Sequence, residues 1–320
     1  MNEKIMVLGA TGQIGSELVL ELRKRFGGKN VIGVGHSRSP SSEILGSGPY
    51  ETGDVLDVKR IEELCEKHDI GTIYHLAAVL SGVGEKKPQF AWDLNMNGLI
   101  NVLEVARKKN IKVFWPSSIA VFGNNCPHLN TPQDTVLQPT TMYGVTKVAG
   151  ELLCDYYHRK YGVDVRSVRY AGIISAETPP GGGTTDFAVA IFYEAVRDNR
   201  YSCFVNERTV LPMMYMPDCI SAAIGIMQAP AERLTTRLGY NLNGLNFSAA
   251  ELAEMVRARS PGFAISYEPD FRQAIADSWP DSLDDSRAAQ DWGWKAEWSL
   301  ERLADDMFAT LRKRKAEGKL

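Results

Sequence analysis

The sequence has few cysteines, and nothing in their spacing points to a disulfide framework or a metal site. Its 320 residues include five cysteines, an odd number, and none is spaced as CxxC. That pattern argues against both a disulfide-stapled scaffold and a zinc ribbon, so we expect reduced cysteines that mostly lie in the core, and no bound metal. They stand at positions 65, 126, 154, 203 and 219.

Long apolar runs and a strong charge of either sign are also lacking. No run approaches the roughly 18 apolar residues of a membrane span, and the amino terminus lacks the layout of a signal peptide. The formal net charge of −3 gives no positive field for nucleic acid or anionic lipid. We therefore expect a cytoplasmic protein that binds neither nucleic acid nor a membrane. A homodimer is expected too, although no residue pattern carries that expectation.

Short apolar runs alternate with helix-like segments through the first half of the chain. The runs "KIMVLG", "NVIGVG", "GTIYHLA" and "IKVFWPSS" are nearly continuous, and helical patterns lie between them. Strands of this kind, separated by helices, indicate a parallel sheet covered on both faces. The predicted fold is α/β, a doubly wound parallel sheet of the Rossmann type. Its ligands should sit at the carboxyl ends of the strands.

The pattern becomes irregular after about residue 175. The segment "SAETPPGGGTTD" is rich in proline and glycine and predicts a loop, and later helical segments are separated by long non-periodic stretches. We expect two domains: a dinucleotide-binding domain over residues 1–175 and a smaller substrate-binding lobe over residues 176–320.

Three glycines at a three-residue spacing follow the first predicted strand, in "GATGQIG" at residues 9–15, and a helical pattern follows them. Gly9 permits a tight turn, Gly12 lets the backbone approach a pyrophosphate, and Gly15 lets the helix pack on the sheet. Free N–H groups and the helix dipole attract an anion at this point. Spaced glycines also occur in ordinary turns, but the strand before and the helix after them favour dinucleotide binding.

The end of the second predicted strand normally distinguishes NAD from NADP. A carboxylate there binds the adenosine ribose, whereas an arginine suits a 2′-phosphate. This chain reads "GVGHSR" over residues 33–38, without a carboxylate, and Ser37 with Arg38 could hold a phosphate or simply lie in solvent. After the next strand, Asp54 and Val55 could meet the adenine edge, although Asp54 is equally suited to cap the following helix. These residues leave the choice between the two cofactors open.

Two further clusters lie where predicted strands and helices meet. Ser118 ends the run "IKVFWPSS", and Tyr143 begins a helical pattern with Lys147 four residues on, in "YGVTK". Four residues turn a helix by about 400°, so both side chains lie within about 40° of each other. An ammonium near a phenol favours the phenolate, so we expect Lys147 to lower the pKa of Tyr143. Such a tyrosine can take a proton from an alcohol.

The same spacing recurs at Tyr156 and Lys160. On a continuous helix Tyr156 would lie about 220° around from Tyr143, so it must face elsewhere, and we interpret the second pair as structural. The corresponding interpretation of Tyr143, a tyrosine that covers the edge of the sheet, is less favoured because Ser118 and the glycine turn accompany it.

Several of these segments together resemble the extended short-chain dehydrogenase/reductase family. They are "GATGQIG", "HLAA" at residues 75–78, "NMNGLINVLE", "SSIAVFG", "YGVTK" and "VRYAGIIS", which cover most of residues 5–175. Farther along, "PGGGTTDFAV", "LPMMYMPD" and "DSWPDSLDDSRAAQDWGW" resemble the L-threonine 3-dehydrogenases of the short-chain type within that family. The resemblance implies hydride transfer from L-threonine to NAD, which gives 2-amino-3-ketobutyrate.

The resemblance also implies roles for particular residues. Tyr143 would take the hydroxyl proton, Ser118 would hydrogen-bond the same oxygen, and Lys147 would hold the nicotinamide ribose. Substrate positions match Ser81, Ser118, Tyr143, Thr184 and Thr185. Glycine N–H groups and threonine hydroxyls of "GGGTTD" could bind a small carboxylate, or the segment could be only a flexible loop. The expected cofactor contacts are Gly9, Thr11, Gly12, Gln13, Ile14, Gly15, His36, Ser37, Arg38, Asp54, Val55, Leu76, Ala77, Ala78, Asn95, Tyr143, Lys147 and Tyr170.

Two positions depart from the family pattern. The family usually has an acidic residue at the position of Gly35 and a proline at that of Ala171, so the resemblance does not carry over at the adenosine ribose and beside the nicotinamide. A nucleotide-sugar 4-epimerase or dehydratase on the same fold would share the glycine turn and the Ser118, Tyr143 and Lys147 set, and is the alternative function. A dinucleotide-sensing protein without catalysis would usually have lost the tyrosine–lysine pair.

Overall fold

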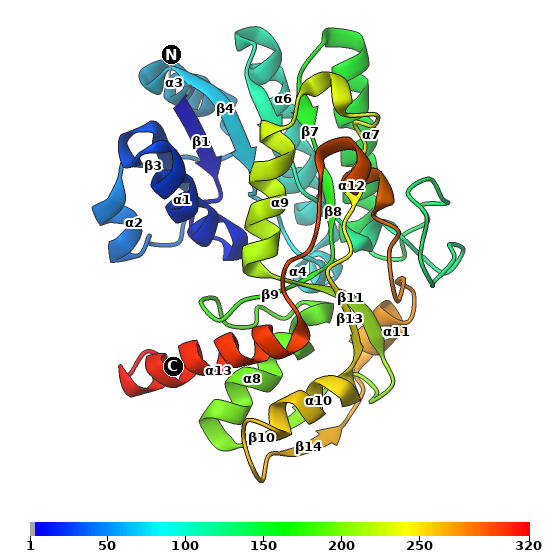
Figure 1. The fold of residues 1–320 in the computed structure, drawn as a ribbon. Helices are drawn as coiled ribbons and strands as arrows, with labels where there is room; N and C mark the ends of the chain where they lie inside the picture. Colours follow the sequence, from blue (N-terminus) through cyan, green and yellow to red (C-terminus); the bar gives the residue numbers. More distant parts are fainter. Residues whose placement is uncertain (1–3) are drawn as a thin grey trace. The chain divides into compact units, whose positions relative to one another are not determined.

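The largest sheet of the protein contains six parallel strands (Figure 1). The computed structural model describes residues 4–320. Across the sheet the strands run in the order β3-β2-β1-β4-β5-β7. They are β1 (Lys4–Leu8), β2 (Val31–Gly35), β3 (Tyr50–Thr52), β4 (Ile70–His75), β5 (Lys112–Phe114) and β7 (Val165–Arg166). The order reverses between β1 and β4, which is the point where open α/β sheets bind ligands. The predicted doubly wound parallel sheet is confirmed.

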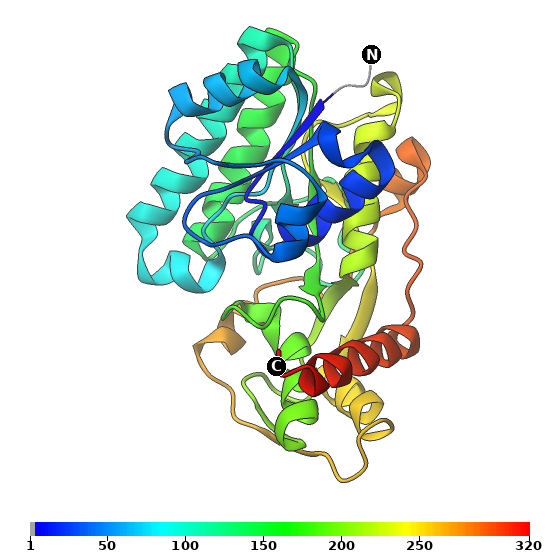
Figure 2. The same cartoon turned by 90° about the vertical axis from the view of Figure 1, so that its left-hand side faces the viewer.

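Helices cover both faces of this sheet, which explains why β1, β2 and β4 are buried along nearly their whole length. Helices α1 and α2 lie on one face, and α3, α6 and α7 lie on the other, where they share one apolar core with the strands (Figure 2). That core includes Met6 of β1, Ile73 of β4 and Leu103 of α6. The helices of this region are α1 (Gln13–Phe26), α2 (Ser42–Ser47), α3 (Val58–His68), α4 (Ser81–Lys86), α5 (Pro88–Trp92), α6 (Gly98–Lys109) and α7 (Met142–Tyr161).

Two compact units alternate along the chain. The first comprises Met1–Ser118, Met142–Arg169 and Ile220–Tyr240, and the second comprises Ile119–Thr141, Tyr170–Cys219 and Asn241–Leu320. The sequence predicted a single boundary after residue 175, whereas the chain passes between the units several times. Hydrophobic periodicity shows which residues are buried but not in which core, so it could not reveal these exchanges.

The second unit contains two small sheets. One has the order β13-β11-β9, and the other pairs β10 with β14. Their strands are β9 (Gly172–Ile174), β10 (Arg200–Cys203), β11 (Val210–Tyr215), β13 (Leu245–Ser248) and β14 (Ala264–Tyr267). The helices are α8 (Phe187–Asp198), α10 (Ala249–Arg257), α11 (Phe271–Ala276), α12 (Ser286–Trp292) and α13 (Leu300–Ala316). Helix α13 packs on α8 through Phe308 and Phe192, whose ring centroids are 5.7 Å apart.

A third short sheet has the order β12-β8-β6. Its strands are β6 (Ser117–Ser118), β8 (Val168–Tyr170) and β12 (Tyr240–Asn241), and helix α9 spans Met216–Gln228. None of the helices within residues 4–320 is long and apolar enough to cross a membrane.

Candidate active site

The turn between β1 and α1 has a shape that only glycine allows at two positions. Gly9 has a φ of +85°, which favours glycine, and a Cβ on it would lie 2.8 Å from the backbone nitrogen of Ala77. A Cβ on Gly15 would lie 2.1 Å from the Gly9 carbonyl oxygen. The backbone N–H groups of Gly9 and Ala10 both donate to the Val34 carbonyl at 3.0 Å, which fixes the turn to β2. The glycine spacing therefore brings β1, α1 and β2 together closely.

The amino end of α1 suits an anion. Gly12 is the N-cap residue, and the first turn of α1 carries no acidic side chain, while the last turn carries Arg23, Lys24 and Arg25. The N–H groups of the first turn and the positive end of the helix dipole are therefore available to a phosphate. Gln13 and Ile14, two of the predicted contacts, are the first residues of this helix.

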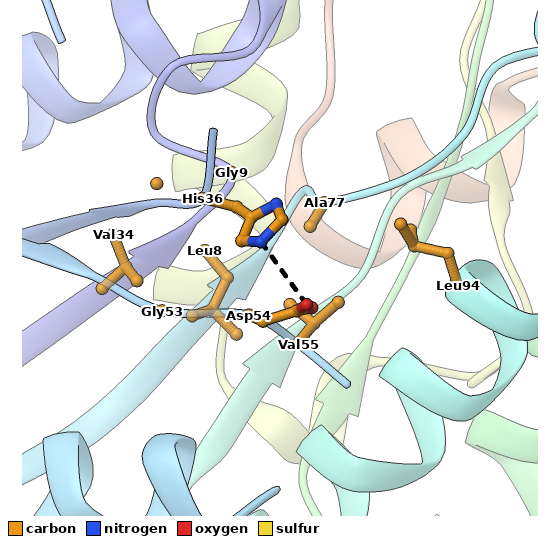
Figure 3. A pocket seen from close by; sticks show the side chains of 10 residues that line it. Leu8, Gly9, Val34, His36, Gly53, Asp54, Val55, Ala77 and Leu94 are labelled. Carbon is orange, nitrogen blue, oxygen red and sulfur yellow. Dashed lines mark ion pairs between the residues drawn. The ribbon is translucent and has the colours of Figure 1, made fainter. Parts of the chain in front are cut away.

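A hollow opens at the carboxyl ends of β1, β2 and β4 (Figure 3). It holds about 350 Å³ of space, including the part open to solvent. Polar groups are few, and His36 Nε2 lies 3.5 Å from Asp54 Oδ2 across it. Such apolar walls with a few polar groups are typical of cofactor sites. The lining residues are Leu8, Gly9, Val34, Gly35, His36, Gly53, Asp54, Val55, Ala77 and Leu94.

Asp54 had two interpretations from sequence, and the structure excludes one of them. The N-cap of α3 is Asp57, whose Oδ1 accepts a hydrogen bond from the Arg60 N–H at 3.1 Å. Asp54 lines the hollow instead, where its Oδ1 accepts from the Leu56 N–H at 2.9 Å. It therefore remains a candidate for the adenosine half of a dinucleotide, as predicted.

Tyr50 occupies the space where the resemblance expects a carboxylate. A Cβ on Gly35 would lie only 2.1 Å from the Tyr50 hydroxyl oxygen and 3.2 Å from Thr11 Cγ2. Burial raises the pKa of the Tyr50 phenol still further above neutral pH. Sequence reasoning missed Tyr50 because only the pairing of β3 with β2, which sets Thr52 beside Gly35, brings it here.

Ser118, Tyr143 and Lys147 come together as predicted, between β6 and α7. The Ser118 hydroxyl hydrogen-bonds the Tyr143 hydroxyl. Lys147 Nζ lies 5.4 Å from the centroid of the Tyr143 ring and 4.4 Å from that of Trp115, and it donates a hydrogen bond to the Pro116 carbonyl at 2.5 Å. A phenol, a hydroxyl and a buried amine therefore converge at one end of α7.

The pKa values of this group differ from the prediction. Burial raises the pKa of Tyr143 to about 12, and the hydrogen bond from Ser118 opposes that rise. Lys147 does not lower it as predicted, because its amine is directed at the Pro116 carbonyl. Burial also lowers the pKa of Lys147 to about 7, against the opposing effects of Cys154 and Glu151. Burial therefore shifts both groups toward their neutral forms, the phenol by raising its pKa and the amine by lowering it.

His75, the last residue of β4, lies near this pair and was not predicted. It is buried, and neither of its ring nitrogens has a hydrogen-bond partner among residues 4–320. Burial, and secondarily the charge of Lys147, lowers its pKa to about 3, so it is neutral at ordinary pH. The motif "HLAA" was the available signal, but it was interpreted only through Leu76, Ala77 and Ala78.

Two other predicted residues have structural hydrogen bonds. The Asn95 side chain accepts from the Val79 N–H at 2.8 Å and donates to Thr146 Oγ1 at 3.1 Å, which joins the segment after β4 to α7. Tyr170 Oη donates to the Cys219 carbonyl at 2.7 Å. Ser81 is the buried first residue of α4. The cofactor and substrate roles of these three remain predictions.

The glycine-rich loop binds a carboxylate of its own. The N–H groups of Gly181, Gly182 and Gly183 all donate to Asp186 Oδ2, at 2.7, 2.7 and 2.8 Å. The prediction that these N–H groups meet a substrate carboxylate is therefore wrong for the structure as it stands. Thr185 remains a candidate, and its Cβ and Cγ2 pack over β9, 2.7 Å from where a Cβ on Gly172 would lie.

The second tyrosine–lysine pair lies apart from the first. Tyr156 is 46% exposed, and its hydroxyl accepts a hydrogen bond from Lys160 Nζ at 2.6 Å. This exposed position confirms that the four-residue spacing alone does not define the candidate active site.

The chain belongs to the NAD dependent epimerase/dehydratase family, whose model matches residues 5–242. NAD is its cofactor, and the glycine turn and the hollow beside it fit the pyrophosphate and adenosine of that molecule. An uncharacterized epimerase/dehydratase of Staphylococcus haemolyticus is 46% identical over 313 residues, 98% of each chain.

Two solved structures are also similar to this chain. One is a GalE-like L-threonine dehydrogenase from Cupriavidus necator in its holo form, with 52% identity, a TM-score of 0.93, and coverage of 96% of this chain and 99% of that one. The other is a monomeric L-threonine 3-dehydrogenase from a metagenome, with 45% identity, a TM-score of 0.93, and coverage of 97% and 99%.

The departure at Gly35 leads to a prediction about cofactor selectivity. We expect NAD to be used with a higher kcat/KM than NADP, but Ser37 and the exposed Arg38 should leave measurable activity with NADP. Because a hydrogen bond between charged groups is worth about 1.5–3 kcal/mol, Arg38→Ala should lower kcat/KM with NADP about tenfold or more and leave the NAD value nearly unchanged. Steady-state kinetics with both cofactors measures this. A wild-type preference for NADP would contradict it.

Proposed function

We propose that this protein oxidises the 3-hydroxyl of L-threonine to 2-amino-3-ketobutyrate. The observation that carries the proposal is the convergence of Ser118, Tyr143 and Lys147 in a chain that is 52% identical to a solved L-threonine dehydrogenase. Bound NAD supplies the acceptor for the hydride that leaves the substrate carbon.

We propose that side chains of the first unit remove the proton and bind the substrate and the cofactor. Tyr143 takes the proton of the substrate hydroxyl, and Ser118, which already hydrogen-bonds Tyr143, donates to the same substrate oxygen. Lys147, whose pKa burial lowers to about 7 and whose Nζ lies 5.4 Å from the centroid of the Tyr143 ring, holds the nicotinamide ribose. Ser81 lies on α4, whose Gly84 approaches the Tyr143 backbone, and we propose that Ser81 contacts the substrate.

The proposal is tested by an assay of the purified protein. L-threonine with NAD should give NADH and an aminoketone in equal amounts, and D-threonine and 2-butanol should react far more slowly, because polar groups built for a zwitterion reject analogues that lack matching groups. The alternative is a nucleotide-sugar 4-epimerase or dehydratase, the class named for the Staphylococcus haemolyticus relative. Turnover of UDP-glucose without turnover of L-threonine would establish that alternative.

Within the second unit, we propose that Thr184 and Thr185 contact the substrate. Thr185→Ala is expected to raise KM for L-threonine and to leave kcat nearly unchanged, the signature of binding lost equally from ground and transition states. Thr178→Ala, in the same loop, is the matched control and should change neither constant. A Thr185→Ala enzyme with wild-type KM would remove Thr185 from the substrate site.

We also propose that the protein is a homodimer in the cytoplasm. Large apolar side chains are exposed on α5, α6 and α7, which favours a protein partner there. They are Phe90, Trp92, Ile100, Val145 and Leu152. The five cysteines are all buried, and none forms a disulfide within residues 4–320, which suits a reducing compartment. Sedimentation equilibrium should give twice the chain mass for the wild type and one chain mass for Leu152→Glu. A monomeric wild type, as described for the metagenome relative, would contradict the dimer.

A further inference from the structure

The segment that carries Ser118 is held by one face of α7. Lys147 Nζ donates to the carbonyl of Pro116 at 2.5 Å, and Tyr143 hydrogen-bonds Ser118. Pro116 and Ser118, the two neighbours of Ser117, are thus each hydrogen-bonded to α7. The next position at that spacing is Glu151, and it lies on the same face of the helix.

Glu151 binds the middle residue of that segment. Its Oε1 accepts hydrogen bonds from Ser117 Oγ at 2.6 Å and from Arg169 Nε at 2.9 Å, and its Oε2 accepts from Arg169 Nη2 at 2.8 Å. The side chains of Glu151 and Arg169 are only 1% and 2% exposed. A buried carboxylate that accepts hydrogen bonds from two nitrogens of one guanidinium has little freedom to move.

Gly239 closes the space around this ion pair. A Cβ there would lie 2.8 Å from Glu151 Oε1, 2.7 Å from Arg169 Cγ and 3.1 Å from Ser117 Cβ. Only a residue without a side chain therefore fits at position 239 beside Ser117, Glu151 and Arg169.

We propose that Glu151 is a positioning residue for the reaction. Its carboxylate, fixed by Arg169, anchors Ser117 and so sets the place at which Ser118 meets Tyr143. Its charge also balances the buried guanidinium of Arg169, which it binds one helical turn from Lys147. The inference rests on the proposed roles of Ser118, Tyr143 and Lys147.

The charges around Lys147 make this role measurable. Burial lowers the pKa of Lys147 to about 7, and Cys154 and Glu151, both on α7, oppose that decrease. From β4, neutral His75 faces it, and the ring of Tyr143 lies 5.4 Å from its Nζ. Without the carboxylate charge, the Arg169 guanidinium is unbalanced and the effect of Glu151 that raises the pKa of Lys147 is lost, so the pKa of the amine falls.

The test is the pH dependence of kcat for L-threonine oxidation with NAD. In the wild type, kcat should rise with pH through an apparent pKa to which the deprotonation of Lys147 contributes. Glu151→Gln removes the charge and should move that rise to lower pH by about one unit. Ser117→Ala removes the anchor without changing a charge. It should lower kcat about 10- to 100-fold, the cost of a small misplacement, and leave the apparent pKa and KM for NAD unchanged.

A double variant distinguishes the effect of the Glu151 charge from an effect on folding. Glu151→Gln with Arg169→Met removes both buried charges, so the apparent pKa should return toward the wild-type value while kcat stays low. A purely structural role would lower thermal stability without moving the apparent pKa. An unshifted pH profile in Glu151→Gln, or wild-type kcat in Ser117→Ala, overturns the proposal. A wild-type protein that does not oxidise L-threonine overturns instead the function on which it rests.

Discussion

Replacing Tyr143 by phenylalanine is expected to lower kcat for L-threonine oxidation by about 10²–10⁴-fold, the usual cost of losing a general base. The phenylalanine ring keeps the packing of α7 but removes the hydroxyl that Ser118 now hydrogen-bonds. The glycine turn and the hollow that line the cofactor site do not include Tyr143. The Kd for NAD should therefore change little, and stopped-flow kinetics with equilibrium binding measures both quantities.

The chain provides its own control for this experiment. Tyr156 has the same spacing to a lysine, lies on the same helix and is 46% exposed. Tyr156→Phe should keep nearly full turnover, since removal of an exposed hydroxyl costs little. Equal losses in the two variants, or a Tyr143→Phe enzyme with most of its turnover, would show that Tyr143 is not the base.

Adding one methyl group at Gly15 should severely weaken cofactor binding. The new Cβ would lie 2.1 Å from the Gly9 carbonyl oxygen and 2.9 Å from its carbon, so the turn must move away from the helix. Overpacking of this kind costs typically about 1–3 kcal/mol in stability. The same displacement shifts the N–H groups at the start of α1, so the Kd for NAD should rise at least about tenfold, equivalent to 1.4 kcal/mol.

Gly46 in α2 is the matched control. Nothing lies within 4 Å of a Cβ built there, and alanine in a helix is favoured over glycine by roughly 0.5–1 kcal/mol. Gly46→Ala should therefore raise the melting temperature slightly and leave the Kd for NAD unchanged. Titration of NAD by tryptophan fluorescence, with calorimetric melting of each variant, makes the comparison. Wild-type NAD affinity in Gly15→Ala would contradict the assigned role of the turn.

Local sequence patterns predicted the parts of the protein that local physics determines. Apolar runs separated by helical segments were enough to predict the parallel sheet. The four-residue spacing of Tyr143 and Lys147 was enough to predict that they lie together, because a helix fixes which residues share a face. The position of Ser118 beside them followed from its place after a strand. These features depend on one element or on two consecutive ones.

Features that depend on contacts distant in sequence were missed. Tyr50 reaches Gly35 only because β3 pairs with β2, and Arg169 reaches Glu151 only because β8 lies near α7. The direction of the pKa shift at Tyr143 was also wrong, because burial is a property of the whole fold and outweighed the local pair. The Gly181–Gly183 backbone was expected to bind substrate, but Asp186 from the following turn takes its place.

The contact between Gly35 and Tyr50 makes cofactor preference a property of two positions that must change together. An acidic side chain at residue 35 requires the Tyr50 ring to shift, because a Cβ built there would lie 2.1 Å from the Tyr50 hydroxyl oxygen. A smaller residue at position 50 alone would leave a void and no carboxylate. Each single replacement is therefore unfavourable where the double replacement is not. Introducing a carboxylate at this strand end therefore involves residue 50 as well as residue 35, although the two positions lie 15 residues apart in the sequence.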